Sequence, residues 1–483
     1  MNAEKLKEFE NIFNPKTVAI IGATQRDDFT NAMMRTKIKD NLFLVNPSHE
    51  EIFGKRCYDS ILDIENTIDY VVLAVPAKVL PVVLNECIEK GVKTAHAFTA
   101  GFSETGLEER IKLENEVKEI IKDRIRLIGP NCMGIYCPKS GLSFSPNAPF
   151  EEGTVGVISQ SGTFAGLFST WGNIRNLRVS KAVSYGNAID LDCPDFLEYF
   201  ADDPETEVIA LYMEGSRDGQ RLKSAMADAS RKKPVIVLKG GVTQHGSRAA
   251  SSHTGSLAGS PEIWSALFKQ TGVIQVETFD ELANTVLAVT RSPLPSGKGV
   301  SMITSTGGFS VIETDVCSKV GLEVPQFTEE TLKELRRIVP AAGTAIRNPL
   351  DAWPLYYNIS DKSETIDDAI KIVALDKNIN SLLLHVDEIS YFMSVFGDTL
   401  EDHLKGLIKL MLDGCEYARN ELGKPVLVCV ELDPYSEDEA DRLYHLMVKK
   451  AFEEKQYPVY PTLEASIMAM FNLYRYGMRF HNE

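Results

Sequence analysis

Short apolar runs that end in small or polar residues constrain the fold of this chain most. The first run, Thr17 to Ile21 (T-V-A-I-I), closes on Gly22-Ala23-Thr24. Similar runs, separated by helical patterns such as Val79 to Lys90 and Leu107 to Lys122, follow at Leu42 to Val45, Tyr70 to Val75, Thr94 to Phe98 and Ile125 to Ile128. Because short continuous apolar runs indicate strands buried on both faces, the alternation predicts a doubly wound α/β domain with a parallel sheet. Ligands of such a domain bind at the carboxyl ends of its strands.

The residues after the first two strands bear on the cofactor. A NAD site needs G-x-G-x-x-G in the first turn and an Asp or Glu after the second strand. This chain has the single turn glycine Gly22, and Asn46-Pro47 follows the second strand. A pocket without that carboxylate could tolerate a phosphorylated ribose, as in coenzyme A or NADP, so both cofactors remain open.

Two later strands run into similar small-residue turns. Thr154 to Ile158 leads to S-Q-S-G-T (Ser159 to Thr163), and Gly299 to Ile303 leads to T-S-T-G-G (Thr304 to Gly308). Such a turn exposes backbone N–H groups at the positive end of a helix and can bind an anion, although an ordinary helix cap uses the same residues. The repetition predicts two related flavodoxin-like domains whose helix N-termini face one phosphate from two sides.

A loop of small residues, Lys239 to Ser260, carries His253 near its centre. An imidazole on a flexible loop can accept a phosphoryl group and carry it. Glu214 follows a predicted strand and could hydrogen-bond this ring and fix its tautomer. A solvated linker with an incidental histidine explains the same loop, and His245 is a second candidate within it.

Charge and cysteine spacing exclude several classes. The net charge of −17 argues against binding to nucleic acid or to an anionic membrane. The eight cysteines form no C-x-x-C pair, so neither a zinc ribbon nor a disulfide framework is indicated, and no metal site is expected. The N-terminus has no apolar signal core and no apolar run is long enough to span a bilayer, so we expect a cytoplasmic protein.

Four histidines beside apolar segments are expected to be structural or surface residues: His96, His385, His403 and His445.

Two stretches rich in Pro, Gly and Ser are predicted to be linkers: Cys137 to Gly153 and Ser292 to Lys298. They divide the chain into three predicted domains at residues 1–145, 150–291 and 297–483.

These motifs together resemble a known family. V-A-I-I-G-A-T, A-G-F-S-E-T-G, G-P-N-C-M-G, S-Q-S-G-T, Y-M-E-G, A-A-S-S-H-T-G-S-L-A-G-S and T-S-T-G-G occur in this order along nearly the whole chain. The chain thereby resembles the α subunit of nucleoside-diphosphate-forming acyl-CoA synthetases, typified by ADP-forming acetyl-CoA synthetase and related to succinyl-CoA synthetase. The resemblance implies a Rossmann-like CoA-binding domain followed by two flavodoxin-like CoA-ligase domains.

The resemblance also implies a reversible reaction in which acyl-CoA, phosphate and ADP give a carboxylic acid, CoA and ATP. His253 would carry the phosphoryl group and Glu214 would orient its ring. The positions that match the coenzyme A site are Gly22, Ala23, Thr24, Asn46, Pro47, Val75, Pro76, Asn131 and Cys132. The positions that match the two phosphate-binding helix ends are Ser159, Ser161, Gly162, Thr306, Gly307 and Gly308.

The sequence has no G-x-x-x-x-G-K-[ST] loop and no stretch similar to a nucleotide-grasping domain. We therefore expect an ATP-grasp β subunit as partner, in an α2β2 assembly, which would bind most of the Mg-ADP or Mg-ATP. The substrate would be a small carboxylic acid or its acyl-CoA.

One departure from the family lies after the first turn, where the family usually has a basic residue and a glycine and this chain has the stretch Gln25 to Lys37, which includes Asp27 and Asp28. These carboxylates would repel a CoA diphosphate unless they point away, with Arg26, Arg35 or Lys37 compensating. Two other readings stay open: a noncatalytic CoA-binding or scaffold protein of the same fold, and a NADP-dependent oxidoreductase.

Overall fold

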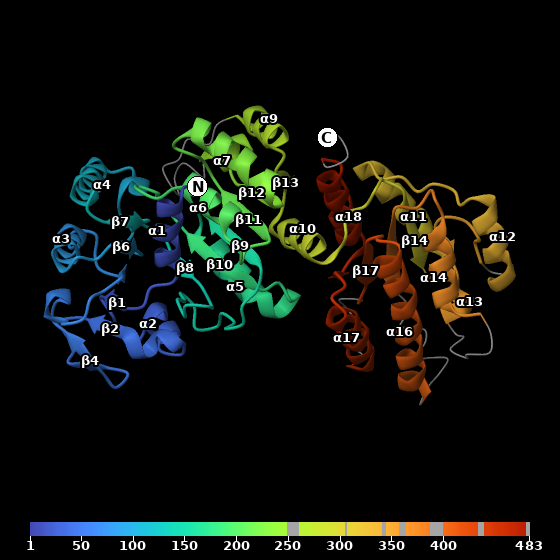
Figure 1. The fold of residues 1–483 in the computed structure, drawn as a ribbon, viewed down its shortest axis with the longest axis horizontal. Coiled ribbons are helices and arrows are strands. Elements are labelled where there is room, and N and C mark those ends of the chain that lie inside the picture. The colour runs from blue at the N-terminus through green and yellow to red at the C-terminus, as the bar shows by residue number, and fades with distance from the viewer. Residues whose placement is uncertain are drawn as a thin grey trace. The chain divides into compact units, whose positions relative to one another are not determined.

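The structure is a computed structural model, and it describes residues 1–248, 260–304, 307–340, 344–356, 364–386, 399–432 and 439–479. The chain divides into two compact units, Met1–Leu282 and Ala283–Glu483. The first unit contains a seven-stranded and a six-stranded sheet, and the second contains a five-stranded sheet (Figure 1). The predicted α/β fold with parallel sheets is confirmed.

The first sheet has the order β3-β4-β2-β1-β5-β6-β7. Only the short β3 runs antiparallel to its neighbour. The five predicted strands are confirmed to within a residue or two, and β3 and β4 were not predicted. The strands are β1 (Val18–Ile21), β2 (Leu42–Val45), β3 (Glu51–Ile52), β4 (Lys55–Tyr58), β5 (Tyr70–Leu73), β6 (Thr94–Ala97) and β7 (Arg126–Ile128), and the helices are α1 (Ala3–Phe13), α2 (Asp28–Met33), α3 (Leu80–Lys90) and α4 (Glu108–Ile121).

The second sheet has the order β13-β12-β11-β9-β10-β8. All its pairs are parallel except that of β8 with β10. Its strands are β8 (Gly134–Tyr136), β9 (Val155–Ser159), β10 (Val179–Ser184), β11 (Val208–Met213), β12 (Val235–Lys239) and β13 (Ile274–Val276). Its helices are α5 (Gly162–Arg175), α6 (Cys193–Asp202), α7 (Gly219–Lys232), α9 (Pro261–Thr271) and α10 (Phe279–Arg291), the last of which runs into the second unit.

The stretch from Cys137 to Gly153 was expected to be a linker, and this prediction is wrong in part. Cys137 pairs with Leu142 in an isolated antiparallel bridge directly after β8. Phe144 is almost fully buried and its ring lies 5.9 Å from that of Tyr136. Because these apolar side chains pack into the core, a segment with the composition of a linker closes the edge of the second sheet.

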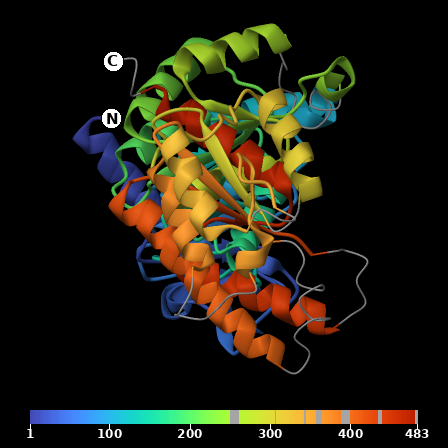
Figure 2. The same cartoon turned by 90° about the vertical axis from the view of Figure 1, so that its right-hand side faces the viewer.

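The third sheet has the order β15-β14-β16-β17-β18, and all its pairs are parallel. It lies between α18 on one side and α14 and α16 on the other (Figures 1 and 2). Its strands are β14 (Val300–Thr304), β15 (Leu350–Asp351), β16 (Ser381–Val386), β17 (Val426–Val430) and β18 (Val459–Tyr460). The helices are α11 (Gly307–Val320), α12 (Glu329–Ile338), α13 (Trp353–Tyr356), α14 (Ile366–Leu375), α16 (Leu400–Glu416), α17 (Glu439–Glu454) and α18 (Leu463–Gly477).

Helix ends follow local sequence signals. Asp192 begins α6, where its carboxylate accepts a hydrogen bond from the Cys193 amide and forms a capping box with Asp195. Gly91 ends α3 with φ of 85°, a left-handed conformation that glycine adopts without strain.

One strand in each sheet marks the point where the strand order reverses. In sequence order, β1 is followed by its neighbour β2 on one side and then by β5 on the other. In the same way β9 lies between β10 and β11, and β14 lies between β15 and β16. Open parallel sheets bind ligands at such switch points. The small-residue turns predicted to bind ligands all follow these three strands.

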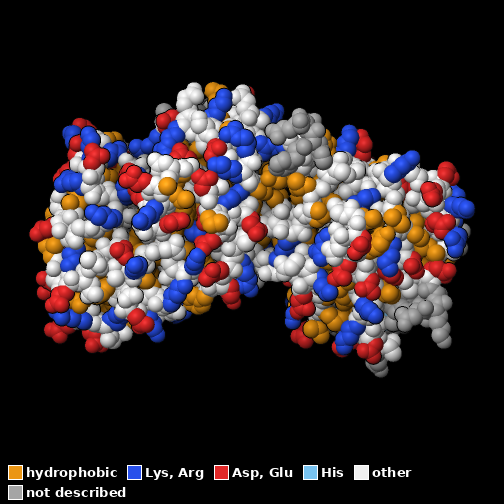
Figure 3. Space-filling model, viewed as in Figure 1, with side chains coloured by type: hydrophobic (Ala, Val, Ile, Leu, Met, Phe, Trp, Pro, Cys, Tyr) orange, Lys and Arg blue, Asp and Glu red, His pale blue; other side chains and the backbone are white. Residues whose placement is uncertain are grey.

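The surface is highly charged, and acidic and basic side chains are interspersed over the face shown in Figure 3. Within the described ranges, no helix combines the length and the apolar composition needed to cross a membrane.

Candidate functional site

The first turn requires glycine at position 22. Gly22 has φ of 90°, and a Cβ there would lie 2.2 Å from the carbonyl oxygen of Ala74 on the neighbouring strand end. Asn46 reaches across from the end of β2, and its Nδ2 donates to the carbonyl oxygen of Ala23 at 2.9 Å. The predicted coenzyme A residues of this turn therefore lie together at the carboxyl ends of β1 and β2: Gly22, Ala23, Thr24, Asn46 and Pro47.

Asp27 points into this turn and does not point away from it. One carboxylate oxygen accepts hydrogen bonds from the Thr24 amide at 2.6 Å and the Thr24 hydroxyl at 3.2 Å. The other accepts from the Thr30 amide at 2.7 Å, so Asp27 is the N-cap of α2. Asp28 is exposed. The Asp27 carboxylate thus accepts hydrogen bonds from amides that would bind the diphosphate of a ligand in other Rossmann-like folds.

The turn after β7 brings Asn131 and Cys132 beside the end of β5. The Asn131 amide donates to the Thr99 carbonyl at 2.9 Å, and the Thr99 hydroxyl donates to the Val75 carbonyl at 2.7 Å. Cys132 is buried, and burial raises the pKa of its thiol to about 12. A neutral thiol is a poor nucleophile, so Cys132 is suited to contact a ligand and not to attack it.

The turn between β9 and α5 presents the helix N-terminus openly. The side chain of Ser159 accepts from the Ser161 amide at 3.2 Å and donates to the Ser161 carbonyl at 2.6 Å. Ser161 is the N-cap of α5, but its side chain makes no capping hydrogen bond. Gly162 follows, and a Cβ there would lie 2.6 Å from Cγ of Met133. The first amides of α5 therefore have no side-chain cap and could bind an anion.

A cavity of about 460 Å³ joins these features. It brings together predicted coenzyme A residues and predicted phosphate residues, which come from the first and second sheets of the same unit. Its lining residues are Ala74, Val75, Pro76, Phe98, Thr99, Ala100, Asn131, Cys132, Met133, Gln160, Ser161, Gly162 and Thr163. An acyl thioester and an inorganic anion could meet in this space.

Glu214 lies directly after β11 and is almost fully buried. The Tyr212 hydroxyl donates to its carboxylate at 3.1 Å. The Gln160 side-chain oxygen accepts from the amides of Glu214 at 2.8 Å and Gly215 at 3.2 Å. Gln160 thereby ties the glutamate to the turn that begins α5.

Lys239, the last residue of β12, is a residue that sequence reasoning did not assign. Its ammonium donates to the backbone carbonyl of Glu214 at 2.7 Å and lies 4.9 Å from the centre of the Trp264 ring. Burial lowers the pKa of Lys239 to about 8, although nearby Glu214 raises it. The signal in the sequence was a lysine at the end of an apolar strand, where a charge is costly to bury.

His253 and Thr306 lie outside the described residues. His245, the other histidine of the loop, belongs to a helical turn at residues 244–248, and its Nδ1 lies 2.5 Å from Nη2 of Arg248. Gly307 and Gly308 begin α11 in the second unit, directly after the switch-point strand β14.

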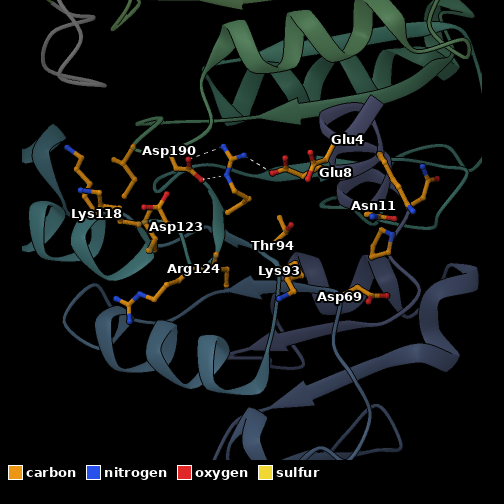
Figure 4. A pocket seen from close by; sticks show the side chains of 18 of the residues that line it. Glu4, Glu8, Asn11, Asp69, Lys93, Thr94, Lys118, Asp123, Arg124 and Asp190 are labelled. Carbon is orange, nitrogen blue, oxygen red and sulfur yellow. Dashed lines mark hydrogen bonds and ion pairs between the residues drawn. The ribbon is translucent and has the colours of Figure 1, made fainter. Parts of the chain in front are cut away.

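A larger hollow of about 1360 Å³ lies at the opposite edge of the first sheet (Figure 4). Thr94 and Arg126, the first residues of β6 and β7, line it. Arg126 donates to Asp190 at 2.9 Å and to Glu8 at 2.6 Å, and thereby joins α1 to a segment of the second sheet's domain. Among the described residues that line this hollow, none is a predicted site residue. The predicted residues that line the smaller cavity lie instead at the carboxyl ends of the strands.

Comparison with protein families agrees with this geometry. A model described as a CoA binding domain matches residues 16–138. A model described as a succinyl-CoA ligase like flavodoxin domain matches residues 152–289. The cavity residues are divided between these two matched regions.

Individual relatives extend the match over the chain. The alpha subunit of ADP-forming acetate–CoA ligase I from Pyrococcus furiosus is 34% identical over 480 residues, which cover 97% of both chains. ADP-forming acetate–CoA ligase from Methanocaldococcus jannaschii is 42% identical over 349 residues, 71% of this chain and 49% of that protein. The chain thus spans about half the length of the M. jannaschii relative, and 54% of enzyme I of Archaeoglobus fulgidus.

A solved structure shows the same fold. It is the Ca. Korarchaeum cryptofilum dinucleotide forming acetyl-coenzyme A synthetase 1 in complex with phosphate and ADP, with a TM-score of 0.79, 28% sequence identity and coverage of 97% of each chain. The chain belongs to the family of ADP-forming acetate–CoA ligases and corresponds over its length to their alpha subunit.

Proposed function

We propose that this chain is the α subunit of an ADP-forming acyl-CoA synthetase. The observation that carries the proposal is the single cavity in which Asn131 and Cys132 lie beside the uncapped N-terminus of α5. Coenzyme A would extend from the turns after β1 and β2, past Val75 and Pro76, and place its thioester in this cavity. Family membership and the CoA-binding match at residues 16–138 favour coenzyme A over NADP.

The first chemical step is an acyl transfer to phosphate. Phosphate bound at the amides of α5, near Ser159, Ser161 and Gly162, attacks the thioester carbonyl. The carbon–sulfur bond breaks, coenzyme A leaves as its thiolate, and an acyl phosphate forms. The positive end of α5 would stabilise the phosphate oxygens throughout.

The second step moves the phosphoryl group to His253. A ring nitrogen attacks the phosphorus, the bond to the acyl oxygen breaks, and the free carboxylate leaves. Glu214 would accept a hydrogen bond from the N–H of the other ring nitrogen, hold the tautomer and stabilise the positive charge on the ring. Thr306, Gly307 and Gly308 match the family's second phosphate-binding helix end and remain a predicted phosphate site of the second unit. The K. cryptofilum relative, whose structure holds phosphate and ADP, supports this assignment of ligands.

The third step needs a partner. We propose an ATP-grasp β subunit that binds Mg-ADP and receives the phosphoryl group from His253, in an α2β2 assembly. The M. jannaschii relative is about twice as long as the matched region, and the P. furiosus relative is named as a subunit. Within this scheme residues 1–145, 150–291 and 297–483 would act as three functional parts, and a small carboxylic acid would be the product.

Labelled ATP tests this proposal. The chain is mixed with an ATP-grasp β subunit of the family, magnesium and γ-labelled ATP, and protein-bound phosphate is measured. We expect label that is stable to alkali and lost in acid, as phosphohistidine is. His253→Ala should abolish it, whereas His245→Ala, a change in the same loop, should keep it. Label that survives His253→Ala and is lost in His245→Ala would refute the site assignment.

A further inference from the structure

Three potential metal ligands that the proposed reaction does not use gather at the carboxyl edge of the third sheet. His385 on β16 and Cys429 on β17 are register partners on adjacent parallel strands. Neighbouring residues of a parallel pair point to the same face of a sheet, and so does a residue two positions further along. Glu431 is that residue after Cys429. One donor atom from each of these three side chains lies within 4.8 Å of the others.

Glu313 on α11 orients the histidine. Its Oε1 lies 2.7 Å from Nδ1 of His385, and both side chains are fully buried. The ring of Phe309, one turn earlier on α11, meets the His385 ring edge-on at 5.2 Å. With Nδ1 bonded to the glutamate, Nε2 is the ring nitrogen that faces the other two ligands.

Nε2 of His385 is buried and has no hydrogen-bond partner among the described residues. It lies 3.6 Å from Oε2 of Glu431, which exceeds hydrogen-bond distance. Glu431 is itself held in place, because its Oε1 accepts a hydrogen bond from the Leu463 amide at 2.9 Å. A buried ring nitrogen and a fixed carboxylate oxygen therefore face each other at ion-pair distance, with no hydrogen bond between them.

We propose that His385, Cys429 and Glu431 bind a divalent transition metal ion, with zinc as the ion that this ligand set fits best. Thiolate and imidazole select zinc over magnesium or calcium, and zinc accepts a carboxylate as third ligand. Three protein ligands leave one tetrahedral position for water or a carboxylate oxygen. The Glu313 carboxylate on the far ring nitrogen is the partner that metal-bound histidines usually have.

The distances allow the site to close on an ion. Zinc–nitrogen and zinc–sulfur bonds of about 2.0 and 2.3 Å place tetrahedral ligands roughly 3.5 Å apart. The separation of 3.6 Å between His385 and Glu431 already fits this value. Cys429 needs to approach by about 1.3 Å at most to reach this spacing.

Cobalt(II) tests the proposal, because it occupies zinc sites and is coloured. The full chain is freed of metal with a chelator and titrated with Co²⁺ alone. We expect one ion per chain, a thiolate-to-cobalt charge-transfer band in the near ultraviolet, and intense visible bands of tetrahedral cobalt that zinc abolishes. Failure of the wild-type chain to bind one Co²⁺ at micromolar concentrations would overturn the proposal without any variant.

Variants separate the proposed site from adventitious binding. Cys429→Ser should remove the charge-transfer band. Cys317→Ser is the matched control, since Cys317 is also buried in this unit but lies against Met302, and it should keep the band. Glu313→Gln should weaken the affinity about 10- to 100-fold while preserving the spectrum. A spectrum unchanged in folded Cys429→Ser, checked by circular dichroism, would show that the ion binds elsewhere.

Discussion

At the scale of single residues, Asp27 distinguishes this chain most clearly. Its carboxylate accepts from the amides of Thr24 and Thr30 at the switch point of the first sheet. A coenzyme A diphosphate that approached this turn would meet a negative charge and amides already engaged. We therefore expect Asp27 to weaken coenzyme A binding.

Asp27→Ser tests this expectation, because serine also caps helices but carries no charge. We predict that coenzyme A binds about 5- to 10-fold more tightly, the equivalent of roughly 1 kcal/mol, as measured by titration calorimetry. Asp28→Ser removes an exposed neighbouring charge and should change the affinity much less. Weaker binding by Asp27→Ser would mean that the carboxylate instead holds the turn in its binding conformation.

Lys239 supplies a pH-dependent prediction. Its pKa is lowered to about 8 by burial, so its charge is lost as the pH rises through 8. Lys239 begins the proposed carrier loop, and its ammonium donates a hydrogen bond to the Glu214 carbonyl. Because this bond weakens when the charge is lost, phosphohistidine formation should decline from pH 7 to pH 9. Lys239→Arg, which keeps its charge, should flatten this decline, and Lys239→Met should be slow at every pH. A wild-type pH profile that Lys239→Arg does not alter would exclude this positioning role.

His96 makes stability depend on pH. Burial lowers its pKa to about 3, with a smaller opposing contribution from a backbone bond at Cys132. In the unfolded chain His96 is protonated as the pH falls through about 6.5, but in the folded chain it stays neutral. The contribution of His96 to the free energy of unfolding is therefore fully present above pH 6.5 and is lost on acidification. At pH 4.5, two units below this value, the free energy of unfolding should be lower by about 2 to 3 kcal/mol.

Denaturant unfolding of His96→Leu measures this contribution. Leucine suits the apolar surroundings of Phe29 and Tyr70, so the variant should lose stability less steeply between pH 6.5 and 4.5. Equal acid sensitivity in both proteins would assign the effect to other groups.

At the scale of elements, the N-terminus of α5 is the feature on which the proposed chemistry depends. Gly162 lies where a Cβ would meet Cγ of Met133 at 2.6 Å, and both residues line the cavity. Gly162→Ala should push Met133 into the space for phosphate. We predict at least a 10-fold loss in phosphate-dependent turnover of acyl-CoA, seen as a raised KM for phosphate.

Gly166→Ala is a matched control on the same helix, because nothing lies within 4 Å of a Cβ at that position. It should leave the KM unchanged and stabilise the protein by up to about 1 kcal/mol, since alanine favours helix over glycine. Equal KM changes in both variants would indicate a general effect on α5 and not a blocked site.

Elements with a strong local pattern could be predicted from the sequence. The buried strands β1, β2, β5, β9 and β11 are continuous apolar runs, and parallel strands buried on both faces need that pattern. The hairpin of β3 with β4 and the antiparallel β8 were missed because they are short edge elements with mixed composition. Their pairing depends on neighbouring strands and not on their own residues.

At the scale of the whole molecule, the division into two units has a measurable consequence. The cavity and the proposed coenzyme A residues all belong to Met1–Leu282, whereas the His385 cluster belongs to Ala283–Glu483. A ligand stabilises the unit that binds it. We predict that coenzyme A raises the melting temperature of a transition assigned to the first unit, and that zinc raises that of the second.

Scanning calorimetry of the full chain makes this measurement, with Gly162→Ala and Cys429→Ser assigning the two transitions. A single transition shifted equally by both ligands would show that the two units unfold together and not as separate cooperative parts.

The sequence by itself determined the fold class, the switch-point turns and the family, because buried strands, small-residue turns and the histidine loop each leave a local pattern. Tertiary structure alone decided which residues meet. Asn131 and Ser161 share a cavity, Asp27 enters its own turn, and His385 faces Cys429 and Glu431. Such contacts depend on strand register and on side-chain direction in segments that are far apart in the chain. No local sequence pattern encodes which of these distant residues come together.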